Sequence, residues 1–248
     1  MCRKVVWITS LTDYVNHIAG NCTGEHFLFR GQLDGEALLP RFGRPPLHPD
    51  PVNTEVRMRE DLERCSPRLL GRLPANRWEW LALGQHYRMP TRLLDWTFNA
   101  LAALWFAVSR RQAAQGRING AVWALEFRDE DIIVPRKKDD PHGIKRTGVL
   151  LPKHIEGRIA AQSGCFTVHR YDDGDRRYIA LDEDPLHKDH LTKLVVAEAL
   201  FGDLRDQLHR VGVNQSMLFP DMDGLCAHLD WFHRRPHGSG AAAQSGCT

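Results

Sequence analysis

The chain has 248 residues, of which 42% are hydrophobic and 26% are charged. This balance is typical of a globular protein and excludes a wholly disordered chain. The formal net charge of +2 is too small to indicate nucleic-acid binding from composition alone.

The cysteines and the hydropathy pattern indicate in which cellular compartment the protein is expected. The six cysteines are widely spaced and include no CxxC pair, which fits neither a zinc knuckle nor a compact disulfide scaffold. The apolar stretch at residues 5–8 is shorter than the roughly 7–15 residues of a signal-peptide core. No run approaches the roughly 18 apolar residues of a membrane span. We therefore expect a cytoplasmic protein with free thiols and no membrane association.

The first thirty residues predict a strand, a helix and a second strand. The strands fall at residues 4–8 and 26–30. Thr9 or Ser10 is the expected N-cap of the helix between them, and Gly20 ends it.

Helical patterns dominate the next segment, and β-type runs follow. The predicted helices cover residues 53–73, 78–87 and 99–111. The predicted strands after them cover residues 120–127, 165–169 and 178–181. Two more helices are expected at residues 190–211 and 223–233. We predict one α+β domain over residues 1–235, with a mixed or antiparallel sheet and flanking helices, and a disordered tail over residues 236–248.

The densest group of polar residues is QHYRMPTRLLDWT at residues 85–97. Charges between two apolar helices must be paired or face a cleft, because an isolated buried ion is costly. Two interpretations stay open. The segment forms a binding site, or Arg92 and Asp95 bridge and lock the turn while His86 bonds a backbone carbonyl. Asp95 or Thr97 is the expected cap of the next helix.

Two long motifs carry a family resemblance. HFLFRGQ at residues 26–32 and WEWLALGQHYRMPTRLLDWTFNALAALWFAV at residues 78–108 resemble the FRG domain, which is named for a Phe-Arg-Gly tripeptide. Residues 158–169 and 218–224 also match that family's pattern, so the resemblance covers about residues 20–232. The sequence departs from the family at Arg88, where Gly is usual. We expect the backbone there to need no positive φ, and the larger side chain to narrow a nearby pocket.

A weaker resemblance links the chain to ADP-ribosyltransferases. Their core opens with an aromatic-Arg-Gly strand, continues with a Ser-Thr-Ser-like strand into an alanine-rich helix, and ends with a strand that bears a catalytic Glu. Residues 29–31 fit the first element, residues 95–97 stand at the second, and residues 156–166 stand at the third. The sequence departs from the pattern because Asp-Trp-Thr replaces Ser-Thr-Ser and no Glu-x-Glu or Gln-x-Glu pair stands in the third element.

This resemblance implies NAD as the cofactor and assigns roles to residues. Arg30 would hold the phosphates, because a guanidinium donates two parallel hydrogen bonds. Gly31 would let the backbone approach the nicotinamide, and Trp96 or Tyr87 would stack on it. Breaking the nicotinamide–ribose bond builds an oxocarbenium-like charge that a carboxylate stabilises. The catalytic candidates are His86, Asp95 and Gln162. The cofactor-binding candidates are Arg30, Gly31, Gln85, Thr91, Arg92, Trp96 and Thr97.

Other acids remain open as the catalytic carboxylate, namely Glu156, Asp221 and Asp223. Asp221 or Asp223 is also the expected cap of the terminal helix, and Arg158 is as suited to a structural role as to a pocket. Cys165 lies in an apolar run and is expected in the core. No metal site is expected, because the thirteen histidines are scattered without an HExxH motif.

The sequence therefore favours an NAD-binding ADP-ribosyltransferase or NAD hydrolase, a toxin or immune effector of a bacterial conflict system. Its acceptor would be a protein or a nucleic acid. The alternatives are a non-catalytic nucleotide or nucleic-acid binding module, and a nuclease that uses His86 and Asp95.

Overall fold

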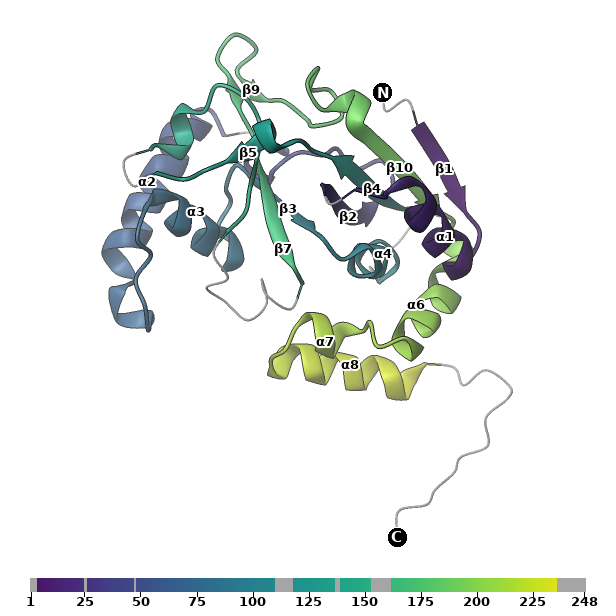
Figure 1. The fold of residues 1–248 in the computed structure, drawn as a ribbon. Helices are drawn as coiled ribbons and strands as arrows, with labels where there is room; N and C mark the ends of the chain where they lie inside the picture. Colours follow the sequence, from purple (N-terminus) through teal and green to yellow (C-terminus); the bar gives the residue numbers. More distant parts are fainter. Residues whose placement is uncertain are drawn as a thin grey trace.

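The computed structural model describes residues 4–24, 26–46, 48–109, 118–136, 139–152 and 162–235. Its centre is an eight-stranded sheet with the strand order β1-β10-β4-β2-β3-β7-β6-β5 (Figure 1). The strands are β1 (Lys4–Ile8), β2 (Phe27–Leu33), β3 (Leu93–Thr97), β4 (Gly120–Glu126), β5 (Ile132–Ile133), β6 (Gly148–Leu150), β7 (Gly164–Val168) and β10 (Leu191–Val196). The β1–β10 and β5–β6 pairs are parallel and the other pairs are antiparallel. The predicted α+β class with a mixed sheet is confirmed.

Seven described helices and a small hairpin surround this sheet. The helices are α1 (Leu11–Asn21), α2 (Pro51–Cys65), α3 (Arg77–His86), α4 (Ala100–Val108), α6 (Phe201–Arg210), α7 (Gln215–Leu218) and α8 (Met222–Arg234). The hairpin consists of β8 (Tyr171–Asp172) and β9 (Arg177–Tyr178). Helices α2 and α3 lie beside one end of the sheet, while α7 and α8 lie below β7 and α4 in the view of Figure 1.

Side-chain caps begin several of these helices. Ser10 caps α1 by accepting from the Asp13 backbone N–H, as predicted. Asn99 caps α4, so the prediction that Asp95 or Thr97 does so is wrong. Both of those residues lie in β3, which ends before the cap.

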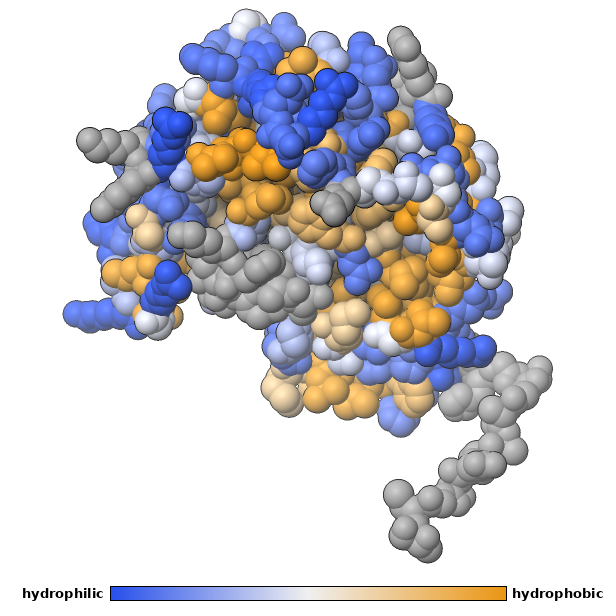
Figure 2. Space-filling model, viewed as in Figure 1, coloured by the Kyte–Doolittle hydropathy of each residue, from blue (hydrophilic) through white to orange (hydrophobic). Residues whose placement is uncertain are grey.

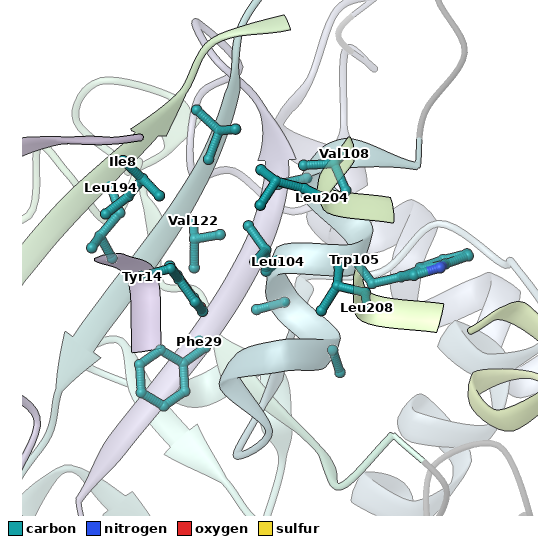
Figure 3. Close-up of a cluster of buried hydrophobic side chains, with 14 of the residues drawn as sticks. Ile8, Tyr14, Phe29, Leu104, Trp105, Val108, Val122, Leu194, Leu204 and Leu208 are labelled. Carbon is teal, nitrogen blue, oxygen red and sulfur yellow. The ribbon is translucent and has the colours of Figure 1, made fainter. Parts of the chain in front are cut away.

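The alanine-rich helix α4 packs directly on β2, and Gly31 makes this possible. A Cβ at Gly31 would stand 1.8 Å from the Ala103 carbonyl oxygen and 2.6 Å from the Ala107 nitrogen. Around this contact, side chains of the sheet, α1, α4 and α6 form one buried cluster, in which Phe29, Leu104 and Leu204 are labelled in Figure 3. The face of β2 opposite Phe29 carries Leu28, which belongs to a second cluster.

The predicted helix at residues 190–211 is wrong in its first part. Leu191–Val196 forms β10, between β1 and β4, and α6 begins only at Phe201. Leu191, Leu194 and Val195 have the i, i+3, i+4 spacing of a helix, but the segment pairs with two neighbouring strands and forms part of the sheet.

The surface carries one exposed apolar stripe on α8. Met222, Leu225 and Leu229 are exposed there, and Figure 2 shows apolar residues gathered over α7 and α8. Among the helices of the described residues, none is long and apolar enough to cross a membrane. The predicted disordered tail at residues 236–248 lies outside the described residues.

Candidate functional site

Two cavities open beside β3 and share part of their lining. One has a volume of about 260 Å³ and the other about 200 Å³. The residues that line both are Asp95, Trp96, Gln162 and Phe219. The larger one, here called the Arg30 cavity, is completed by Phe29, Arg30, Gly31, Thr97 and Phe106. The smaller one, the His86 cavity, is completed by Gln85, His86, Arg88, Gly164, Cys165 and Phe166.

Asp95 is exposed because of its place in β3. The alternation of the strand sends Leu94 and Trp96 into the core and leaves Asp95 on the other face. Strand β3 pairs with β7 along its whole length, but it meets β2 only at the Phe29–Thr97 pair. The two strands therefore diverge beside Asp95, and its carboxylate faces both cavities.

The Asp95 carboxylate is held by an oriented amide. The Gln85 side-chain nitrogen at the end of α3 donates to Asp95 Oδ2 at 2.8 Å. The other end of that amide is fixed, because the buried Thr91 hydroxyl donates to Gln85 Oε1 at 2.7 Å. Thr91 lines neither cavity, so it acts on the site only through Gln85.

Arg30 is also held by uncharged oxygens. Its Nε donates to Gln32 Oε1 at 2.9 Å, and its Nη1 donates to the Asp95 backbone carbonyl at 2.8 Å. These bonds orient the guanidinium beside the Arg30 cavity.

Three further predicted site residues form walls. Trp96 is only 3% exposed and donates from Nε1 to the Thr167 hydroxyl. Its ring therefore belongs to the core below the site and has no exposed face on which a base could stack. The Thr97 hydroxyl donates to the Gln162 carbonyl. The Gln162 side-chain nitrogen donates to the Leu218 carbonyl at 2.9 Å, which ties this wall to the end of α7. Gly31 lines the Arg30 cavity, but the side where its Cβ would stand is filled by α4.

Arg92 does not belong to the site, and its predicted cofactor-binding role is wrong. It is fully buried and pairs with Glu55 of α2, with 2.6 Å between Arg92 Nε and Glu55 Oε2. The alternative that Arg92 bridges Asp95 is also wrong. A partner 37 positions earlier, in a heavily charged segment, gave no signal in the sequence.

Arg88 adopts a left-handed backbone conformation with φ of 66°. The expectation that this position needs no positive φ is therefore wrong. The Met89 backbone N–H donates to the Gly84 carbonyl, a bond typical of a helix end that turns through a left-handed residue. Glycine would suit this turn without strain. The side chain of Arg88 lines the His86 cavity, as expected.

The remaining candidates differ in whether they line one of the two cavities. His86 lines the His86 cavity with its ring edge-on to Tyr87, at 4.9 Å between centroids. Asp221 caps α8 by accepting from the Gly224 N–H, and neither it nor Asp223 lines either of the two cavities. The other candidates in this group, Glu156 and Arg158, lie outside the described residues.

Phe219 and Phe106 line the site and were missed at the sequence level. Their ring centroids lie 6.0 Å apart, and Phe219 reaches both cavities. The signal for Phe219 was its place in LFPDMDG, although that segment suggested a helix start and two candidate acids and gave no role to the aromatic ring. Cys165 is buried as expected, and burial together with the nearby Asp95 charge raises the pKa of its thiol. Within the described ranges, no group of three or more His, Cys, Asp or Glu side chains could hold a metal ion.

Comparison with known families assigns the part of the chain that builds most of this site. Residues 25–116 match the family model of the FRG domain. This segment of the chain is similar to the FRG domain. The FRG match includes both long motifs, and with them Arg30, Gln85, His86 and Asp95, whereas the segments at residues 158–169 and 218–224 lie beyond it. No curated protein and no solved structure matches the chain.

Proposed function

We propose that the two cavities bind NAD and that the protein cleaves the nicotinamide–ribose bond, as an ADP-ribosyltransferase or an NAD hydrolase. One observation carries this proposal. Arg30 and Asp95 line the same cavity, and each is held in place by hydrogen bonds to uncharged groups. Such bonds fix the positions of a cation and an anion that line one cavity, where both can contact a ligand.

The chemistry follows from these two charges. The Arg30 guanidinium suits the pyrophosphate of NAD, because it donates parallel hydrogen bonds to phosphate oxygens. The Asp95 carboxylate would stabilise the positive charge that develops on the ribose as nicotinamide leaves. Phe106 and Phe219 supply apolar surface for a base. An effector that consumes NAD would act in the cytoplasm and harm the cell that contains it, as a toxin or immune effector of a bacterial conflict system does.

The test is NAD binding by calorimetry together with nicotinamide release by purified protein. We expect Asp95→Asn to bind NAD about as tightly as wild type and to release nicotinamide at least about 100-fold more slowly. Arg30→Ala should lose binding and release together. Asp223→Asn is the matched control, since this exposed carboxylate lines neither cavity.

Three outcomes would contradict the proposal. Equal release by wild type and Asp95→Asn would exclude the carboxylate. Tight NAD binding without any release would favour a non-catalytic nucleotide-binding module. Loss of intact RNA or DNA on incubation without NAD would favour a nuclease.

A further inference from the structure

The position of Asp95 gives the His86 cavity a direct relation to the proposed reaction. Asp95 lies in the wall that the two cavities share. A ribose carbon placed over this carboxylate, with the NAD phosphates at Arg30, would be reached from the His86 cavity. The second cavity is therefore the place from which a nucleophile would approach.

Arg88 supplies this cavity with an unused cation. The described residues offer its guanidinium no hydrogen bond and no ion pair, and the side chain is exposed along the cavity. Its backbone is fixed, because the Arg41 Nη1 donates to the Arg88 carbonyl at 2.9 Å and the left-handed turn closes the end of α3. Non-glycine residues held in this conformation concentrate at functional sites. A fixed backbone and an unpaired guanidinium favour the binding of an anionic group.

His86 lies in the same cavity and supplies a proton acceptor. It follows Gln85, which holds Asp95, and precedes the turn that carries Arg88. Imidazole is the side chain best suited to accept a proton near neutral pH. The cavity therefore combines a group that attracts a phosphate with a group that deprotonates a hydroxyl.

We propose that the His86 cavity is the acceptor subsite and that its acceptor is RNA. This inference rests on the proposed function. In RNA each 2′-hydroxyl stands next to a phosphate, which matches the pair of His86 and Arg88. The ribose–nicotinamide bond of NAD breaks, and its electron pair leaves with nicotinamide. The 2′-hydroxyl oxygen forms the new bond to that ribose carbon, and its proton passes to the His86 imidazole.

The experiment incubates the full chain with labelled NAD and a short single-stranded RNA, with DNA of the same sequence in parallel. We expect the label on RNA and not on DNA. Arg88→Gly should lower the ratio of RNA labelling to nicotinamide release at least about 10-fold and weaken RNA binding, whereas Arg88→Lys should retain part of both.

Arg176→Gly is the matched control. Arg176 is also an exposed arginine with a positive φ, of 51°, but it lies in the β8–β9 hairpin and lines neither cavity. Both glycine variants relieve the same kind of strain, so neither should lower Tm, and Arg176→Gly should label RNA like wild type.

The two proposals fail in different ways. Nicotinamide release without RNA labelling, equal labelling of DNA, or labelling of protein instead would overturn the RNA acceptor and leave NAD cleavage standing. An absence of nicotinamide release would overturn both.

Discussion

Arg30 and Arg92 both lie in the matched FRG segment, yet Arg30 lines a cavity and Arg92 is buried. Arg92 is buried and faces the Glu55 carboxylate, so the two charges satisfy each other inside the protein. Arg30 donates to an amide and a backbone carbonyl beside a cavity. A buried charge that faces an opposite charge indicates a structural role, whereas an oriented charge that lines a cavity is placed to contact a ligand.

The buried cluster around Arg92 consists of Glu55, Arg92, His142 and Tyr178. The Tyr178 hydroxyl donates to Glu55 Oε2 at 3.4 Å, and His142 Nε2 lies 3.5 Å from the same oxygen. Burial and the Arg92 charge lower the pKa of His142, which favours its neutral form. The cluster joins α2, β9 and the residue that precedes β3, and none of its four members lines either cavity.

The largest expected effect is the difference in unfolding free energy between variants of Arg92 and variants of Arg30. Arg92→Met should lower the free energy of unfolding by about 3–5 kcal/mol, because it leaves Glu55 buried without its partner. Arg30→Met should cost about 1 kcal/mol, since the bonds of Arg30 to Gln32 and to the Asp95 carbonyl lie beside a cavity, where water can replace the guanidinium. Urea denaturation measures both. The double variant Glu55→Gln with Arg92→Met should be less destabilised than Arg92→Met alone. A loss from Arg30→Met as large as that from Arg92→Met would remove the distinction.

The floor of the site gives a pH-dependent prediction. Trp96 donates to Thr167, whose hydroxyl lies 3.1 Å from His169 Nε2. Burial lowers the pKa of His169 to about 4, from an ordinary value of 6.5. The unfolded chain thus takes up this proton first, and stability present above pH 6.5 is lost as the pH falls toward 4. The shift corresponds to roughly 3 kcal/mol.

The measurement for His169 is the unfolding free energy of wild type and His169→Gln at both ends of that pH range. The advantage of wild type over the variant should shrink by up to roughly 3 kcal/mol at the acid end. A constant difference across the range would show that His169 is not held neutral.

A smaller effect on stability is expected at Gly31 of the Phe-Arg-Gly motif. Gly31→Ala should destabilise the fold by about 1–3 kcal/mol, because the added Cβ meets the Ala103 carbonyl of α4. Gly20→Ala is the control, since this glycine lies in α1 with nothing within 4 Å of an added Cβ, and it should be neutral or stabilising. Thermal unfolding of both variants measures the two effects. A Gly31→Ala protein as stable as wild type would contradict the close packing of α4 on β2.

The sequence could predict the parts of the site that lie in long, specific motifs. Arg30 and Asp95 are 65 positions apart, and only the family resemblance linked them before the structure placed both on one cavity. The role of Arg92 could not be predicted, because the ion pair with Glu55 joins segments with no shared pattern. The strand β10 was mistaken for helix because Leu191, Leu194 and Val195 have helical spacing, and only the pairing with β1 and β4 makes the segment extended. The left-handed turn at Arg88 was missed because an arginine gives no local signal for a positive φ.

The proposed NAD site at Arg30 and Asp95 is tested most directly by titrating NAD into wild type, Arg30→Met and Arg176→Met in the calorimeter. We expect wild type and Arg176→Met to bind NAD equally well, while Arg30→Met loses at least about 10-fold in affinity through the missing phosphate contact. Equal binding by all three proteins, or binding by none, would contradict it.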